Sequence, residues 1–210
     1  MYKKGWLFNG SLMIFVLIMQ KDQLRNAIKL ERDQLSVNDL AQMSGLITNN
    51  LLGSFQWKKK RINVFLPIKQ NKEIDLRDFI KKVLKLDGNI CINRTDFSNK
   101  KMTPIEFNQQ LQIKNNKYGI PEPVEGKEVQ MNDIDIVIVP LLCFNANGHR
   151  LGYGGGFYDR FLKLTKSTCI KIGVCHFAEP RAIHGIESTE IGRAHVRTPV
   201  TEKSRMPSSA

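Results

Sequence analysis

The sequence predicts an α/β fold, a single domain in which a mostly parallel sheet is flanked by helices in a Rossmann-like, three-layer arrangement. Residues 134–142 (IDIVIVPLL) are apolar at almost every position, as expected for a central parallel strand that is covered on both faces. Segments with helical periodicity alternate with further short apolar runs, which is typical of a sheet with right-handed crossovers. The chain has 210 residues, enough for one domain with a core of useful size.

The first predicted helix covers residues 21–35. Its apolar side chains fall near one helical stripe, at Leu24, Ile28 and Leu35. Its basic side chains fall on an adjoining face, at Lys21, Arg25 and Arg32. Lys21 and Arg25 are one helical turn apart and therefore share a face, which by itself indicates no more than a solvated surface.

Two more helices are predicted before the central strand. Ser36 and Asp39 have the spacing of a capping box, and the helix that they begin is expected to reach about Leu52. Residues 75–86 form the next helix, which Asp87-Gly88 ends.

Four other segments are predicted as extended structure. Residues 61–66 form a strand that Pro67 stops, residues 89–93 form a short buried strand, and residues 171–177 form another. Residues 102–113 are harder to assign and are interpreted as a hairpin. The sequence contains no internal repeat and no long linker, which favours a single folded unit.

The formal net charge of +12 suits a nucleic acid, an acidic membrane surface or a small polyanion as partner. The charge is spread along the chain, and one local run, residues 58–61, is interpreted as a solvated basic face. The sequence has no recognition-helix pattern, zinc spacing or aromatic RNA-binding strand. We therefore expect neither nucleic acid nor membrane as a partner, and interpret the charge as attraction for acidic small molecules.

The four cysteines are Cys91, Cys143, Cys169 and Cys175, and none forms a Cys-x-x-Cys pair. The sequence therefore has no zinc or redox motif of that kind. Cys143 and Cys175 lie in apolar, strand-like runs and are predicted to be buried thiols. This use of cysteine suits a reducing cytoplasm, which is the expected location.

A glycine-rich loop after the central strand carries the strongest functional signal. Four glycines lie within five positions, directly before a helix-compatible run at residues 157–164: Gly152, Gly154, Gly155 and Gly156. A loop without Cβ atoms lets an anion approach the backbone N–H groups, and a helix N-terminus behind it adds positive potential. We therefore predict a phosphate chain as ligand, with Asp159 placed to hold the accompanying magnesium ion.

The loop matches neither of two common nucleotide-binding motifs. A Walker loop requires Lys and then Ser or Thr after its last glycine, and neither stands there. A dinucleotide fingerprint requires a glycine at the position of Phe157. A glycine-rich turn without a ligand is the alternative interpretation, and the flanking Arg150, Tyr158, Asp159 and Arg160 argue against it.

Residues 133–162 (DIDIVIVPLLCFNANGHRLGYGGGFYDRFL) closely resemble the signature of the 5-formyltetrahydrofolate cyclo-ligase family, whose members are also called 5,10-methenyltetrahydrofolate synthetases. Other segments agree in order and spacing: residues 21–25 (KDQLR), residues 64–67 followed by 73–75, and residues 118–123 (YGIPEP). The resemblance extends from about Met19 to about Glu179. The glycine-loop motif is specific, whereas the other segments are persuasive only together.

The resemblance implies an ATP-dependent ligase that forms a carbon–nitrogen bond in folate one-carbon metabolism. Such an enzyme closes 5-formyltetrahydrofolate to 5,10-methenyltetrahydrofolate and releases ADP and phosphate, with Mg2+ as cofactor and ATP as co-substrate. Folate and ATP are then the small-molecule partners, and the protein is expected to be monomeric, soluble and cytoplasmic. The reaction needs alignment and charge neutralisation rather than a protein nucleophile, and the sequence displays no Ser/His/Asp or Cys/His arrangement.

The resemblance also implies the site residues. It assigns ATP contacts to Lys21, Arg25, Arg150, Leu151, Gly152, Tyr153, Gly154, Gly155, Gly156, Phe157 and Tyr158. It assigns substrate contacts to Leu66, Glu73, Tyr153, Gly154, Gly155, Gly156 and Phe157, with Tyr118 as a weaker candidate. Asp159 matches a magnesium ligand, and no side chain is assigned a direct catalytic role.

Several of these residues have a purely structural alternative. Glu73 could be a carboxylate at the start of the following helix, and Asp159 could cap the helix after the loop. Phe157 and Tyr158 could be core aromatics, although at least one of them is expected to face a flat ligand ring.

The chain departs from the family pattern at two places. Asn93-Arg94 stands where Pro-Arg or Pro-Lys is common, and Arg94 is expected to keep the cationic role. Residues 183–186 (IHGI) stand where the Asp of a second magnesium site is expected, and the last strand of the sheet is expected to be missing. His176 and His184 are interpreted as core or surface histidines. We therefore expect this chain to be impaired as an enzyme.

Both ends are expected to lie outside the catalytic domain, which we place at residues 19–190. Residues 1–18 resemble the charged start and apolar stretch of a signal peptide, but the apolar run is too short to span a bilayer. An upstream extension or a misplaced start codon is the preferred interpretation. Residues 191–210 lack periodic hydrophobicity and resemble a translated sequencing-library adapter, so they are predicted to be a non-native, disordered tail.

Two other classes of function remain open at this point. A non-catalytic module that binds anions or RNA would show salt-dependent RNA affinity without folate turnover. Another phosphoester-binding enzyme, such as a sugar-phosphate isomerase, would need a positioned base near the loop, and the sequence displays none clearly.

Overall fold

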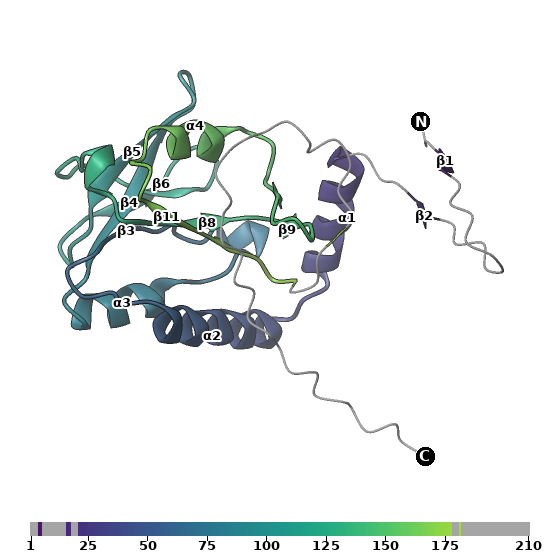
Figure 1. Cartoon of the computed structure of the whole chain (residues 1–210), viewed down its shortest axis with the longest axis horizontal. Coiled ribbons are helices and arrows are strands. Elements are labelled where there is room, and N and C mark those ends of the chain that lie inside the picture. The colour runs from purple at the N-terminus through teal and green to yellow at the C-terminus, as the bar shows by residue number, and fades with distance from the viewer. Residues whose placement is uncertain (1–3, 6–15, 18–20, 178–180, 182–210) are drawn as a thin grey trace, which may run out of the picture.

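The computed structural model describes residues 4–5, 16–17, 21–177 and 181 of the chain (Figure 1). Two short strands near the start, β1 (Lys4–Gly5) and β2 (Val16–Leu17), pair with each other. The expectations for the rest of residues 1–18, for His184, for the missing last strand and for residues 191–210 concern positions outside the described ranges.

The main sheet has five strands in the order β11-β8-β3-β4-β5. They are β3 (Arg61–Asn63), β4 (Asn89–Asp96), β5 (Lys101–Glu106), β8 (Ile136–Pro140) and β11 (Ile170–Val174). All neighbouring pairs are parallel except β4 and β5. The prediction of a mostly parallel sheet is therefore confirmed, and β8 lies inside it with a parallel neighbour on each side.

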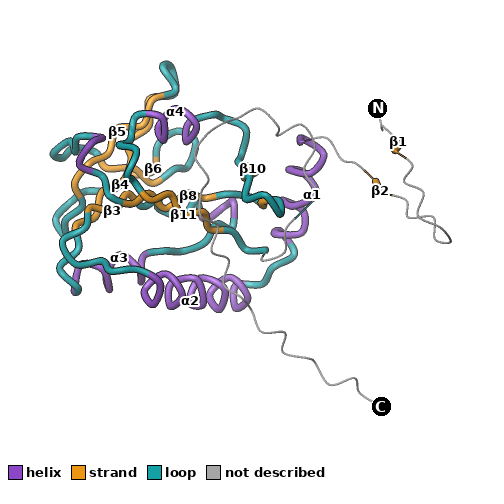
Figure 2. The backbone as a smooth tube through the Cα atoms, viewed as in Figure 1, coloured by secondary structure: helices purple, strands orange, loops and turns teal. Residues whose placement is uncertain are grey.

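Helices cover both faces of this sheet. Figure 2 shows the strands as a central layer, with α2 (Val37–Ser54) and α3 (Arg77–Lys85) on one side and α4 (Phe157–Lys163) on the other. α1 (Lys21–Asp33) lies beside one end of the sheet. The three-layer arrangement predicted from the sequence is confirmed.

Shorter elements complete the described part of the chain. β9 (Cys143–Phe144) and β10 (Arg150–Leu151) form one hairpin, and β6 (Ile113–Asn115) and β7 (Pro121–Pro123) form another. Two 3-10 turns, η1 and η2, cover Lys69–Asn71 and Met131–Asp133. Among the described residues, no helix combines the length and apolar content that crossing a bilayer requires.

Side chains of β8 alternate between two separate hydrophobic clusters. Ile136 and Ile138 pack in the cluster that includes α2 and α3, whereas Val137 and Val139 pack in the cluster that includes α4. Successive side chains of a strand point to opposite faces, so a strand covered on both faces must be apolar at every position. This explains why residues 134–142 read as a continuous apolar run.

The starts of the first two helices follow the predicted signals. α1 begins at Lys21 and α2 at Val37, where Ser36 is the N-cap residue. The Ser36 Oγ accepts a hydrogen bond from the Asp39 N–H at 3.1 Å, and the Asp39 carboxylate accepts one from the Ser36 N–H at 2.9 Å. The capping box is thus confirmed.

The boundaries of two strands and the predicted hairpin needed correction. β3 has only three residues, because Val64 donates its N–H to Cys91 but the chain then leaves the ladder. β4 extends to Asp96 and forms the hairpin with β5, so the hairpin is not contained in residues 102–113. The Asp96 carboxylate accepts N–H bonds from Ser98 and Asn99 and thereby stabilises the turn between them.

The carboxyl ends of β3, β4 and β8 lie at the same edge of the sheet, because these strands are parallel. Ligands of open α/β sheets bind in the crevice outside the carboxyl ends of the strands. The glycine-rich loop follows β8 and the β9–β10 hairpin, so the topology places it at this edge. The exposed lysines of residues 58–60 precede β3 and therefore lie at the opposite edge, which agrees with their interpretation as a solvated face.

Candidate active site

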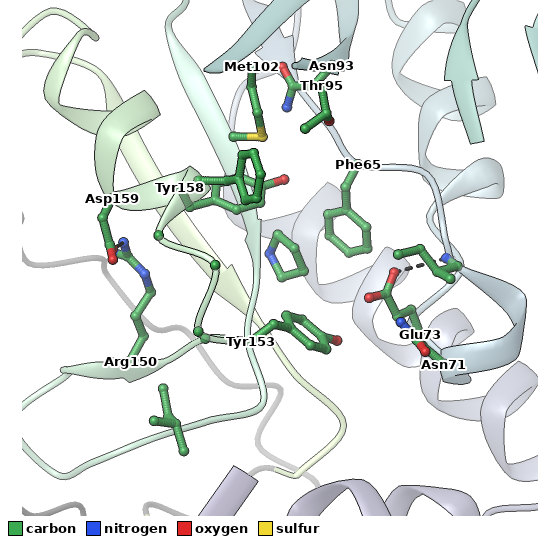
Figure 3. A pocket seen from close by; sticks show the side chains of 18 of the residues that line it. Phe65, Asn71, Glu73, Asn93, Thr95, Met102, Arg150, Tyr153, Tyr158 and Asp159 are labelled. Atoms are coloured by element: carbon green, nitrogen blue, oxygen red, sulfur yellow. Dashed lines mark hydrogen bonds and ion pairs between the residues drawn. The ribbon is translucent and has the colours of Figure 1, made fainter. Parts of the chain in front are cut away.

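A cavity of about 890 Å³ opens at the carboxyl edge of the sheet (Figure 3). Most of its lining comes from the start of α1, the segment after β3, the second half of β4 and the segment from Asn147 to Asp159. Met102, Ile120, Pro121 and Pro140 also line it. Every residue to which the family resemblance assigns a contact with ATP, substrate or metal is among the lining residues. Tyr118, the weaker candidate, is not.

The glycine loop adopts a backbone that side chains disfavour. Gly154 has φ +98°, and Gly156, the N-cap residue of α4, has φ +70°. Both angles lie in the left-handed region, which costs an L-residue about 1–2 kcal/mol. A Cβ at Gly154 would also lie 3.4 Å from the Cζ of Arg25. The sequence interpretation of these positions as a loop that needs glycine is consistent with this geometry.

α1 holds the loop from one side. The Nε of Arg25 donates to the Gly152 carbonyl at 2.9 Å, and its Nη1 pairs with Asp22. Lys21 lies one turn earlier and also lines the cavity. The alternative that these two cations form an ordinary solvated face is wrong for Arg25, whose side chain is only 20% exposed.

Arg32 is a residue whose position the sequence pattern misjudged. Its spacing predicted a place on the basic face of α1, but the side chain is 4% exposed. The Arg32 Nη1 donates to the Tyr153 hydroxyl at 2.8 Å, and the guanidinium lies 5.5 Å from the centre of the Tyr153 ring. The sequence signal that could have predicted this burial is the position of Arg32 four residues after Ile28, which continues the buried stripe of the helix.

Glu73 lies across the cavity from the glycine loop (Figure 3). Its carboxylate accepts the Ile68 N–H at 2.9 Å. Burial raises the pKa of Glu73 above its usual value, while the Ile68 N–H, the Tyr153 hydroxyl and the Arg32 charge oppose this rise. The alternative that Glu73 begins the next helix is wrong, because α3 starts at Arg77. Leu66 lines the cavity close by, after β3.

Asp159 lies in the first turn of α4, at the rim of the cavity. Its carboxylate forms an ion pair with Arg150, and the two side chains are 51% and 11% exposed, respectively. The alternative that Asp159 caps this helix is wrong, since Gly156 occupies the N-cap position. Asp159 thus presents a half-exposed carboxylate beside the glycine loop.

Aromatic side chains form part of the wall. Phe157 and Tyr158 both line the cavity and both pack against the cluster beneath α4, so neither is only a core residue. The rings of Phe97 and Phe157 are 5.3 Å apart in an edge-to-face arrangement. The Tyr118 ring also packs against Phe97, with 4.2 Å between the ring centres, and Tyr118 is 49% exposed.

These features match a known family. The model of the 5-formyltetrahydrofolate cyclo-ligase family matches residues 18–179, a range that contains every residue lining the cavity. The chain belongs to this family. The resemblance seen in the sequence is thereby confirmed.

Individual cyclo-ligases are similar over most of the chain. The 5-formyltetrahydrofolate cyclo-ligase of Mycoplasma genitalium is 29% identical over 161 residues, which are 76% of this chain and 86% of that protein. The mouse (Mus musculus) enzyme is 30% identical over 152 residues, 68% of this chain and 73% of the relative. The NMR structure of Aquifex aeolicus 5,10-methenyltetrahydrofolate synthetase has a TM-score of 0.63 and 31% identity, covering 75% of this chain and 78% of the other.

The structure of this cyclo-ligase reveals a polar pair in the cavity wall that sequence reasoning missed. Asn63, fully buried at the end of β3, donates to the Asn93 Oδ1 at 2.9 Å and accepts from the Asn93 Nδ2 at 3.1 Å. Asn93 lines the cavity and interacts with the Tyr158 hydroxyl. Asn93 thus takes part in the site at the position where Pro was expected.

Arg94 points elsewhere. It forms a surface ion pair with Glu128 at 3.2 Å and is not among the residues that line the cavity. The expectation that Arg94 keeps a cationic role in the site is therefore wrong for this arrangement. Successive residues of a strand point to opposite faces, and of these two Asn93 is the one that lines the cavity.

The remaining titratable residues agree with the sequence interpretation. All four cysteines are buried free thiols, and burial raises the pKa of Cys175 to about 12. His176 is half-buried, and burial, followed by the nearby Arg32 charge, lowers its pKa to about 4. It is therefore neutral near pH 7, as expected for a core histidine. Among the described residues, no three His, Cys, Asp or Glu side chains are grouped closely enough to hold a metal ion by themselves.

Proposed function

We propose that this chain catalyses the ATP-dependent closure of 5-formyltetrahydrofolate to 5,10-methenyltetrahydrofolate, with release of ADP and phosphate. The observation that carries the proposal is one cavity with two unlike walls. On one side is a glycine loop held by Arg25, and on the other is the half-buried carboxylate of Glu73. A loop of this kind suits phosphate, and a carboxylate suits the amino and ring N–H groups of a pterin.

The chemistry requires these two ligands to meet. The formyl carbon on N5 is a poor electrophile, because the nitrogen donates electrons into the carbonyl. Transfer of the γ-phosphoryl group of ATP to the formyl oxygen makes that oxygen a leaving group. N10 then attacks the carbon, and departure of phosphate leaves the methenyl bridge. The protein has to align the substrates and neutralise charge, and needs no nucleophile of its own.

The ATP contacts are proposed to come from α1 and the loop. Lys21 and Arg25 supply cations at the cavity edge, and the loop supplies backbone N–H groups from residues 150–158. Gly154 and Gly156 allow close approach because they hold left-handed backbone without a Cβ. The strongest support is the Arg25 hydrogen bond to Gly152, which places a cation directly beside the loop.

The folate contacts are proposed to come from both walls. Glu73 and Leu66 lie after β3, and the middle of the glycine loop, residues 153–157, lies opposite. Phe157 offers a flat face for the pterin ring. Contact of the same loop with both ligands is what transfer between ATP and the formyl oxygen requires.

Magnesium is proposed to accompany ATP, with Asp159 as a ligand from the protein. The residues fit this role, because magnesium on nucleotide substrates is held by one or two carboxylates together with phosphate oxygens and water. Arg150 pairs with one oxygen of Asp159, which orients the carboxylate at the cavity rim. Bound magnesium would neutralise negative charge on the transferring phosphoryl group.

The catalytic domain is proposed to span residues 19–190, with the rest of the chain outside it. The buried core described between residues 21 and 177 supports this assignment. We further propose that the protein acts as a monomer in the cytoplasm, where its buried free thiols would remain reduced.

The proposal is tested by following methenyl-tetrahydrofolate absorbance with purified protein, 5-formyltetrahydrofolate, ATP and Mg2+. With the protein present, absorbance should rise only when 5-formyltetrahydrofolate, ATP and Mg2+ are all added. Glu73→Gln keeps the side-chain size but removes the charge, and should raise the KM for folate about tenfold with little change in the KM for ATP. Glu125→Gln, at an exposed position outside the cavity, is the matched control. Turnover by the unaltered protein is expected to be weak, because this chain is expected to be impaired, and a complete absence of ATP-dependent turnover would contradict the proposal.

A further inference from the structure

Arg32 is a buried cation with an incomplete set of partners. Its side chain is 4% exposed, yet among the described residues no carboxylate lies within ion-pair distance of it. Its Nη1 donates to the Tyr153 hydroxyl, while its Nε is buried and has no hydrogen-bond partner in the described part of the chain. Burying a charge is costly unless it is compensated, so the position of Arg32 needs a functional explanation.

Tyr153 connects Arg32 to the cavity. Its backbone belongs to the glycine loop, and its hydroxyl accepts the Arg32 hydrogen bond at 2.8 Å. Figure 3 shows the hydroxyl end of Tyr153 on the side that faces Glu73. The phenol has one proton, and because its oxygen accepts from Arg32, that proton is free to point toward the Glu73 carboxylate.

We infer that Arg32 is a positioning residue that acts through the Tyr153 hydroxyl to hold the Glu73 carboxylate charged and oriented for the N–H groups of the bound folate. The inference rests on the proposed function and adds to it a residue outside the cavity wall. It also gives Tyr153 a second role besides its place in the nucleotide loop. The loop and the folate carboxylate are then arranged by one connected set of side chains.

The opposite charges of Arg32 and Glu73 attract each other. Burial favours the protonated carboxyl and raises its pKa, whereas the Ile68 N–H, the Tyr153 hydroxyl and the Arg32 charge favour the carboxylate. Tyr158 is neutral, because burial raises its own pKa. His176, next to Arg32, is neutral near pH 7. Arg32 is thus the charged group that favours ionisation of Glu73.

Two contacts from α1 reach the same loop. Arg25 bonds to the Gly152 carbonyl and Arg32 bonds to the Tyr153 side chain. They are seven residues, or about two helical turns, apart and therefore share a face of the helix. If the loop moved away from α1, the Tyr153 hydroxyl would also move away from the Glu73 carboxylate. Binding of ATP at the loop and of folate at Glu73 are expected to be coupled for this reason.

The test compares Arg32→Met, Arg32→Lys and Tyr153→Phe with the unaltered protein, and uses Lys29→Met on the same helix as control. Turnover is measured from pH 5 to 9, and binding of 5-formyltetrahydrofolate without nucleotide is measured by calorimetry over the same range. For Arg32→Met we expect folate affinity and KM to worsen about tenfold, and the acid limb of kcat/KM to move up by about one pH unit. Lys29→Met should leave both unchanged.

The other variants separate positioning from folding. Tyr153→Phe should move the acid limb in the same direction, and Arg32→Lys should recover part of the loss, because Lys keeps the charge. The double variant of Arg32→Met and Tyr153→Phe should resemble the more affected single variant, since both act through one connection. If Arg32→Met does not fold, Tyr153→Phe and Arg32→Lys decide the question by themselves.

Three results would overturn the inference. If the unaltered protein is active, and Arg32→Met or Tyr153→Phe has the same acid limb and the same folate affinity as that protein, the connection from Arg32 through Tyr153 to Glu73 is excluded. The proposed function would then remain intact. An unaltered protein that neither binds nor converts 5-formyltetrahydrofolate would overturn both. Loss of stability with unchanged pH dependence would assign Arg32 a structural role only.

Discussion

Replacing Gly154 by Ala is predicted to strain the loop, whereas the same replacement at Gly152 is predicted to leave the stability of the fold intact. The two glycines belong to one loop and line one cavity, so they form a matched pair. Gly154 has φ +98°, and a Cβ built there would lie 3.4 Å from Arg25. Gly152 does not have a positive φ, and a Cβ built there meets no atom within 4 Å.

The expected size of the effect follows from the backbone. A side chain in sparsely populated positive-φ space costs about 1–3 kcal/mol. At Gly152, Ala is free of this strain and lowers the entropy of the unfolded chain, which is worth about 0.4–1 kcal/mol in favour of the fold. The two variants should therefore differ by about 2 kcal/mol. For a domain of this size that corresponds to about 4–8 °C in Tm.

The measurement is urea and thermal unfolding of both variants, followed by circular dichroism, together with calorimetric titration of ATP and Mg2+. If the loop relaxes around the new methyl group, the cost appears as weaker ATP binding instead of lower stability, because the N–H groups then leave their positions. Equal unfolding free energy and equal ATP affinity of the two variants would refute the reasoning about this loop.

Three further predictions concern other parts of the site. Asn63→Ala should lower the free energy of unfolding by about 1–3 kcal/mol in urea titrations, because it leaves the amide of Asn93 without its reciprocal partner; unchanged stability would exclude a role for the pair. Asp159→Asn should raise the Mg2+ concentration for half-maximal turnover about tenfold, yet change stability by less than about 0.5 kcal/mol, because the carboxylate is half-exposed; an unaltered Mg2+ dependence would argue against metal binding. Burial raises the pKa of Cys91 to about 12, so iodoacetamide at pH 8 should label it, as judged by mass spectrometry, only after unfolding; rapid labelling of the folded protein would contradict its burial.

The parts of the site that are local in the chain were predictable. The glycine loop is one continuous segment, and its lack of Cβ atoms follows from its residue types alone. Lys21 and Arg25 share a face because they are one helical turn apart. The roles of Leu66, Glu73 and Asp159 came from a family resemblance, and the structure places all three at the cavity.

Other parts depend on contacts between distant segments and could not be predicted. Arg32 and Tyr153 are separated by 121 positions, and Asn63 and Asn93 by 30. Sequence periodicity reports which face of an element a residue occupies, but not which polar group from another element meets it. For that reason Arg32 was assigned to a solvated face and Arg94, rather than Asn93, to the site.

The amino-acid sequence by itself determined the class of the fold, the position of the central strand and the glycine-rich character of the loop, because each depends on local pattern and backbone sterics. It also carried the motifs that place the chain among the cyclo-ligases. Only the tertiary structure decided which carboxylate faces that loop, which cation is buried behind it and which strand residue enters the cavity. These depend on packing, since burial and distance to a partner, rather than residue type, set the charge and orientation of a polar side chain.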